Sequence, residues 1–154
     1  ARTMPNIAAS VHNSMTTATG DIEIKDLTLE AFGAIGEAIW VNNENQLDIA
    51  SAITASGPAF LSLVAEAIAD GAVKVGLERH LAQHLVQGLF SGTSSLLKHS
   101  HSAIIKDSVM SPGGTTAAGY AQLEEVWVRN AMIKAVESAY NKAIELGKKY
   151  FYIS

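Results

Sequence analysis

A helical segment from residue 56 to residue 75 constrains the fold of this 154-residue chain most strongly. Its apolar side chains recur at the three- and four-residue spacing of one helix face, while Leu61, Ala65 and Ala69 add apolar atoms to a second face. Only three of its residues are charged. A helix that is apolar on two sides is normally buried on two sides. In a domain this small, we expect another copy of the chain to supply the second cover.

Helical periodicity dominates the sequence after residue 25. The stretch 1–25 is instead rich in Thr, Ser and Asn, and we expect an extended arm there, with one strand near residues 14–18. Strand signals are nearly absent beyond this arm, so the predicted fold class is all-α with a short extended N-terminal segment. The expected helices cover residues 29–40, 47–54, 56–75, 79–97, 103–110, 115–123 and 126–146.

The composition argues against several classes of function. A formal net charge of -4 gives no general attraction to nucleic acid or to anionic membranes. No apolar run reaches the roughly 20 residues that a membrane span needs, and we see no secretory signal. Cysteine is absent, which excludes disulfides and thiolate catalysis. We therefore expect a soluble, cytoplasmic protein without nucleic-acid or membrane partners.

Residues 111 to 116, Ser-Pro-Gly-Gly-Thr-Thr, interrupt the helical pattern. Gly113 and Gly114 would let a ligand approach the backbone closely, and a helix that starts at Thr115 would point unpaired amides into the loop. Such a helix start is suited to a small anion such as a carboxylate, and Ser111 and Thr116 add hydroxyl donors. The spacing fits a tight turn between two helices, capped by a threonine, equally well.

Other site motifs are absent from the sequence. It contains no Gly-x-Gly-x-x-Gly and no Gly-x-x-x-x-Gly-Lys-Ser/Thr, and therefore no nucleotide-binding fingerprint of its own. It also lacks the Gly-x-Ser-x-Gly elbow of a hydrolase. His80 and His84 have a spacing that can hold a metal, but no glutamate follows His80 as a zinc protease requires. We predict no metal site.

Two long stretches, residues 47–77 and 104–124, resemble a known family. They read LDIASAITASGPAFLSLVAEAIADGAVKVGL and IIKDSVMSPGGTTAAGYAQLE. Together they closely resemble the C-terminal half of pyrroline-5-carboxylate reductase. The resemblance implies the last step of proline biosynthesis, in which a hydride from NADPH or NADH reduces the cyclic imine 1-pyrroline-5-carboxylate to L-proline.

The resemblance also implies a fold and a partner. Residues 1–25 would be the remnant of a nucleotide-binding Rossmann domain, and residues 26–154 a helical dimerisation and substrate-binding domain. This helical domain would be of the 6-phosphogluconate-dehydrogenase-like type, interleaved with a second copy in a homodimer that can build a higher oligomer of dimers. With most of the Rossmann domain missing, the chain alone should be inactive.

Site residues carry over from the family by position. The hydroxyl of Ser111 and the backbone amides of Gly114, Thr115 and Thr116 would hold the substrate carboxylate. The hydroxyl of Thr116 would face the imine nitrogen, which makes Thr116 the candidate catalytic residue. The run Met4-Pro5-Asn6 would contact the cofactor.

The sequence departs from the family pattern at three places. Ala55 stands where a glycine is usual before Ser-Gly-Pro-Ala, and Ile7-Ala8 follow Asn6 where Thr-Pro is common. Residues 124–128, Glu-Glu-Val-Trp-Val, replace Glu-x-Gly-Gly-Phe, so the turn before the last helix should differ. Two alternatives stay open: a non-catalytic helical assembly module, and a related reductase of another cyclic imine or a keto acid.

Overall fold

The computed structural model describes residues 1–151, with side chains up to residue 148. The chain forms two compact units, one of Ala1–Phe60 with the part from Met132 onward, the other of Leu61–Ala131. The elements are β1 (Arg2–Met4), η1 (Ile7–Val11), β2 (Ser14–Thr19), η2 (Ile22–Ile24), α1 (Lys25–Gly33), β3 (Gly36–Trp40), α2 (Glu44–Thr54), α3 (Gly57–Lys74), α4 (Arg79–Leu97), α5 (Ser102–Ser108), α6 (Thr115–Glu125) and α7 (Val128–Phe151).

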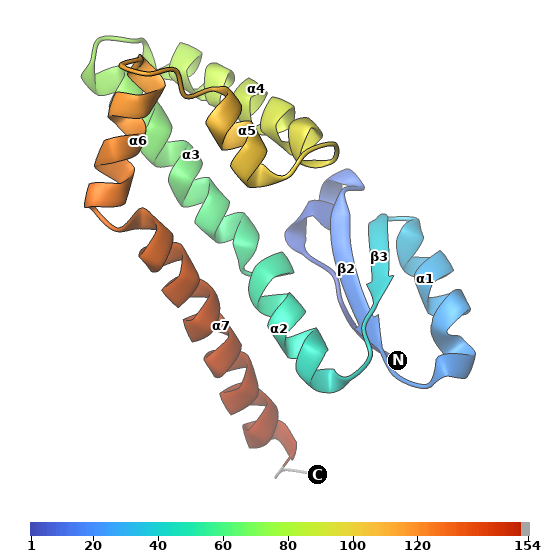
Figure 1. Cartoon of the computed structure of the whole chain (residues 1–154). Coiled ribbons are helices and arrows are strands. Elements are labelled where there is room, and N and C mark those ends of the chain that lie inside the picture. Colours follow the sequence, from blue (N-terminus) through green and yellow to red (C-terminus); the bar gives the residue numbers. More distant parts are fainter. Residues whose placement is uncertain (152–154) are drawn as a thin grey trace. The chain divides into compact units, whose positions relative to one another are not determined.

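A small mixed sheet organises the first unit. β2 lies in the middle, β1 pairs with it antiparallel, and β3 pairs with it in parallel (Figure 1). The register places Gly36 opposite Ser14. A Cβ atom at Gly36 would lie 2.2 Å from the Ser14 carbonyl oxygen, and its φ of +147° also favours glycine. Gly36 therefore allows β3 to start so close to β2.

The strand expected at residues 14–18 is confirmed as β2, but the helix expected at 29–40 is wrong in its second half. α1 ends at Gly33, and β3 occupies residues 36–40. Phe32, Ile35 and Ile39 have helical spacing, and a short apolar run of this kind fits a helix or a strand equally well. The expectation that strands end with residue 25 is wrong for the same reason.

Helix α2 is attached to the sheet by both packing and polar contacts. Leu47 on α2 is fully buried. Arg2 on β1 donates to Glu44 at 2.5 Å and to Asp48 at 2.7 Å. At the other end of α2, the Asn6 side-chain amide donates to the Thr54 carbonyl at 3.0 Å. These contacts make the sheet and α2 one packed body.

The remaining helices confirm most of the predicted pattern. α4 spans the predicted 79–97, and the starts of α2, α3, α5, α6 and α7 lie within three residues of those expected. Asn43 caps α2 by accepting from the Gln46 amide at 2.9 Å, and Gly76 follows α3 with a φ of +110°. α7 is longer than predicted, because it continues through Gly147.

The second unit has a small core between α3 and α4. Ala69, Ala82 and Val86 are buried there, and Arg79 forms an ion pair with Asp70 beside them. Several large apolar side chains of both helices are exposed: Leu61, Leu63 and Ile68 on α3, and Leu81, Leu85, Leu89, Leu96 and Leu97 on α4. Burial of α3 on two faces, as its sequence predicts, is therefore incomplete within one chain.

The apolar character of α2 and α3 also shows in their hydropathy. The segment Glu44–Lys74 is long enough to cross a membrane, and an 18-residue window within it is apolar enough, with a mean hydropathy of 1.5. The expectation that no apolar run is long enough for a membrane span is therefore wrong by the criterion of length and composition. A single such segment is weak support for a membrane span, because core helices of soluble proteins pass the same test. A turn at Ala55 and Ser56 also separates the two helices.

The turn between α6 and α7 contains a residue with a left-handed backbone conformation. Trp127 has a φ of +61° and is 71% exposed. The left-handed region costs a residue with a Cβ atom about 1–2 kcal/mol, whereas glycine enters it freely. Trp127 thus holds a conformation that a glycine would adopt without strain.

We expect Trp127→Gly to be more stable than Trp127→Ala by about 1 kcal/mol, because only glycine relieves the left-handed strain. Both variants lose the same exposed indole, so alanine is the matched control. Urea unfolding at equal protein concentration would measure the difference. A glycine variant that is no more stable than the alanine variant would contradict a strained turn.

Candidate active site

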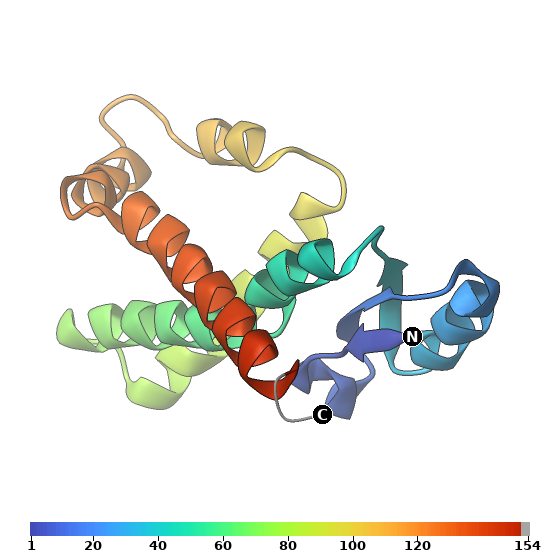
Figure 2. The ribbon, with the colours of Figure 1, turned by 90° about the horizontal axis from the view of Figure 1, so that it is seen from below.

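The loop at residues 109–114 joins α5 to α6 and ends in a tight turn (Figure 2). The Gly114 amide donates to the Ser111 carbonyl at 3.0 Å, which closes this turn. Gly113 has a φ of +68°, a conformation that glycine adopts without strain. After this turn α6 begins at Thr115, as predicted.

The start of α6 presents backbone donors. Gly114 occupies the N-cap position and offers no side-chain cap. The first intrahelical bond runs from the Ala118 amide to the Gly114 carbonyl at 3.2 Å, so the amides of Thr115 and Thr116 precede the ladder. Both threonines are exposed. This geometry can bind one small anion through main-chain N–H groups and the positive end of the helix dipole.

Ser111 lies directly against this helix start. A Cβ atom placed on Gly114 would come within 2.4 Å of the Ser111 Oγ and 3.1 Å of its carbonyl oxygen. The serine hydroxyl thus occupies space that only a glycine leaves open. The structure brings together the four residues predicted to bind substrate, Ser111, Gly114, Thr115 and Thr116. The Gly114 amide is already used in the turn, and could serve a carboxylate only through a shared hydrogen bond.

A cluster of polar side chains lies next to the loop, and our sequence reasoning missed it. The Tyr120 hydroxyl donates to Glu124 Oε1 at 2.5 Å, and Arg129 Nη2 donates to both groups at 2.7 Å. Lys106 on α5 places its Nζ 5.3 Å from the centre of the Tyr120 ring. The four-residue spacing of Thr116, Tyr120 and Glu124 on one helix face was the available sequence signal.

The hydrogen bonds of this cluster shift the pKa values of Glu124 and Tyr120. The bond from Tyr120 and then the bond from Arg129 lower the pKa of Glu124. The same bond to Glu124 raises the pKa of Tyr120 above its usual range. Glu124 is therefore a carboxylate and Tyr120 a neutral donor near pH 7. Because the pKa of Glu124 is lower in the folded chain than in the unfolded one, the ionised Glu124 stabilises the fold at pH values above the usual carboxyl pKa. This stabilisation is lost as the pH falls through the lowered pKa.

The residues predicted to contact the cofactor, Met4-Pro5-Asn6, lie at the end of β1 in the first unit, whereas the substrate loop belongs to the second. Asn6 already has two side-chain partners: its Oδ1 accepts from Ala8 N at 3.0 Å and its Nδ2 donates to Thr54 O at 3.0 Å. One N–H and one lone pair remain for a ligand.

Met4 is half-buried beside Thr17, whose buried hydroxyl lacks a hydrogen-bond partner among the described residues. Pro5 is exposed. With one N–H and one lone pair left on Asn6, this run could offer a ligand only an edge contact. A cradle for the phosphates of a dinucleotide would need a glycine-rich loop that this sequence does not contain.

Comparison with known proteins places this chain in a family. A family pattern described as pyrroline-5-carboxylate reductase dimerisation matches residues 44–146. Pyrroline-5-carboxylate reductase of Synechocystis is 44% identical over 96% of this chain and 57% of its own length. The enzyme of Thermus thermophilus is 40% identical over 96% of this chain and 58% of its own length. The chain thus spans a little over half the length of these relatives.

Solved structures agree in fold as well as in sequence. A pyrroline-5-carboxylate reductase from Coxiella burnetii matches with a TM-score of 0.87 and 34% identity, over 94% of this chain and 56% of that one. The Plasmodium falciparum enzyme, solved with NADP bound, matches with a TM-score of 0.87 and 31% identity, over 94% of this chain and 62% of that one. These matches confirm the predicted family and the helical dimerisation fold: the chain belongs to the pyrroline-5-carboxylate reductase family.

Proposed function

We propose that this chain is the substrate-holding and dimer-forming half of a reductase that converts 1-pyrroline-5-carboxylate to L-proline with NADPH or NADH. The observation that carries the proposal is the start of α6, where the Ser111 hydroxyl and exposed main-chain amides meet at a glycine turn. A carboxylate is the part of this substrate that such a site would bind. The relatives that match this chain bear the name of that enzyme.

The substrate would be oriented by the loop and by one threonine hydroxyl. In our proposal the amides of Thr115 and Thr116 and the hydroxyl of Ser111 donate to the carboxylate. The Thr116 hydroxyl then faces the imine nitrogen and holds or relays the proton that this nitrogen takes up. The bound nicotinamide supplies the hydride for the imine carbon. The contribution of these residues is orientation and a placed donor.

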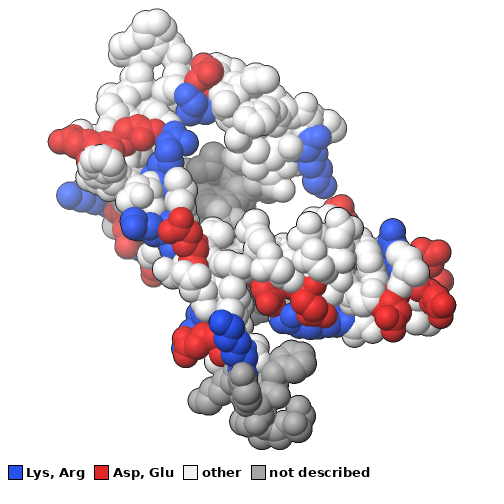
Figure 3. Space-filling view, turned by 60° about the horizontal axis from the view of Figure 1, so that its bottom comes forward, with Lys and Arg blue, Asp and Glu red and all other residues white. Residues whose placement is uncertain are grey.

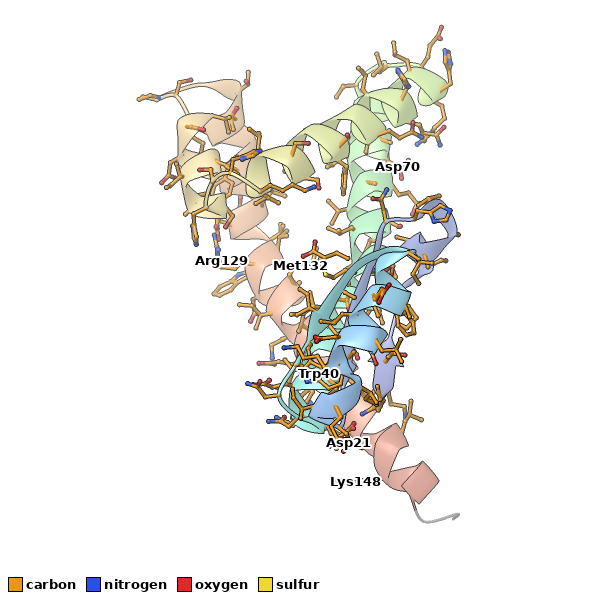
Figure 4. All side chains as sticks on the ribbon, turned by 90° about the vertical axis from the view of Figure 1, so that its right-hand side faces the viewer. Asp21, Trp40, Asp70, Arg129, Met132 and Lys148 are labelled. Atoms are coloured by element: carbon orange, nitrogen blue, oxygen red, sulfur yellow. The ribbon has the colours of Figure 1, made fainter. Side chains whose placement is uncertain are left out.

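The cofactor would be held by a nucleotide-binding domain, with Met4, Pro5 and Asn6 contributing an edge contact. We propose that residues 1–25 are the end of that domain. The parallel pairing of β3 with β2 supports extending it to Trp40, which Figure 4 labels on β3. The match to the dimerisation pattern begins directly afterwards, at residue 44.

The proposed partner is a second copy of this chain, in a dimer that can assemble further. The exposed leucines of α3 and α4 support a partner that removes apolar surface from water. The proposal includes neither nucleic acid nor membrane, and places the enzyme in the cytoplasm. On the face drawn in Figure 3, acidic and basic side chains are interspersed, which supports the absence of a basic patch for nucleic acid on that face.

The chain of 154 residues should form a dimer in solution but should not oxidise NADPH when pyrroline-5-carboxylate is added. The same chain, preceded by any upstream sequence its gene encodes, should form a dimer and should oxidise NADPH when pyrroline-5-carboxylate is added. Sedimentation and the absorbance of NADPH would measure these properties. Clear turnover by the 154 residues alone would contradict the proposed division of labour. A longer protein that binds NADPH without turnover would move the substrate to another cyclic imine or a keto acid. One that does not bind it would favour an assembly module.

Within the active enzyme, Thr116→Ala should lower kcat more than Ser111→Ala. Loss of one oriented donor typically costs about ten- to a thousand-fold, and the Thr116 hydroxyl is the one placed at the reacting nitrogen. Ser95→Ala on α4 removes an exposed hydroxyl that bonds to the Ser91 carbonyl, and serves as the control. An unchanged kcat for Thr116→Ala would remove this residue from the mechanism.

A further inference from the structure

The loop that carries the proposed site is bridged by a cation–π contact. Lys106 lies on α5, five residues before Ser111, and Tyr120 lies on α6, four residues after Thr116. The contact of the Lys106 ammonium with the Tyr120 ring therefore joins the helices on both sides of the loop. It lies one helical turn beyond the candidate catalytic hydroxyl.

The bridge has support that holds its parts in place. Arg129, in the first turn of α7 and labelled in Figure 4, donates to both Tyr120 and Glu124. These hydrogen bonds restrict rotation of the Tyr120 ring, so one face stays available to Lys106. On the other side, Lys106 forms an ion pair with Asp107, and 36% of its side-chain surface is exposed. Its ammonium thus has two partners, the Tyr120 ring and the Asp107 carboxylate.

The loop itself has little packing to order it. Ser111, Pro112 and Gly113 are exposed, and so are Thr115 and Thr116. The carboxylate site needs the Ser111 hydroxyl and the first amides of α6 at a fixed separation, although they lie on opposite sides of a glycine turn. A contact that ties α5 to α6 limits the conformations that this turn can sample.

We infer that Lys106 and Tyr120 are positioning residues, whose cation–π contact holds the substrate loop in its carboxylate-binding conformation. This inference rests on the proposed function. Without the bridge, the loop populates its binding conformation less often, and the apparent affinity for substrate falls by that fraction. Once the carboxylate is bound, it orders the loop itself. The bridge therefore acts on KM for the imine and leaves kcat and KM for NADPH nearly unchanged.

The test uses the active enzyme with variants on both sides of the loop. Lys106→Met keeps most of the aliphatic stem but removes the charge, and Tyr120→Leu removes the ring. Each should raise KM for pyrroline-5-carboxylate about two- to ten-fold, the range of a cation–π contact at a partly exposed site. The double variant should raise it no further than the larger single effect, because both changes break the same contact.

Conservative variants separate positioning from folding. Lys106→Arg keeps a cation over the ring and should restore KM, and Tyr120→Phe keeps the ring and should fall between wild type and Tyr120→Leu. Lys142→Met removes an exposed lysine that is paired with Glu145 on α7, and should leave KM unchanged. A residue with only a structural role would lower the melting temperature without changing KM. Unchanged KM in Lys106→Met and Tyr120→Leu would overturn the inference.

A second measurement keeps the inference testable if the proposed function fails. The Gly114 amide, which bonds to the Ser111 carbonyl, reports whether the turn is closed. If the wild-type enzyme does not reduce pyrroline-5-carboxylate, hydrogen exchange at the Gly114 amide should still be faster in Lys106→Met and Tyr120→Leu than in Lys142→Met. Equal exchange rates in the three variants would overturn the bridge itself.

Discussion

The main constraint on the helical part of this protein is the apolar surface of α3 and α4 that one copy of the chain leaves exposed to water. Ala69 and Ala82 let α3 and α4 pack closely, but side chains this small remove little apolar area from water. More than half of the surface of Leu63 and of Leu85 remains exposed. A second copy that covers these leucines would add to the stability of each chain, so that stability would depend on protein concentration.

Local chemistry made most helix boundaries predictable. Asn43 caps α2 and Gly76 follows α3, and both effects act within a few residues of the boundary. β3 could not be predicted in this way, because its five residues fit a helix or a strand until their pairing with β2 is known. That pairing is a long-range contact, and it depends on the absence of a side chain at Gly36.

The candidate site also has one part that local sequence predicts and another that depends on contacts between residues on different helices. The loop and the start of α6 could be predicted from glycines and hydroxyls that are adjacent in sequence. The cluster around Tyr120 could not, because Arg129 reaches it across the turn between α6 and α7. The direction of that turn is set by the left-handed conformation of Trp127, a conformation that no spacing rule assigns to a tryptophan.

The use of main-chain amides at the start of α6 has a consequence for how this site can vary in evolution. In the proposed site Thr115 would contribute its N–H whatever its side chain, so most substitutions there would leave the donor intact. Only proline would delete this N–H, and a side chain at position 114 would clash with the Ser111 hydroxyl. A binding site of this kind tolerates drift in its side chains while its backbone shape is retained. Its lasting signature in sequence is therefore a pattern of residues without side chains rather than a set of ligand-binding groups.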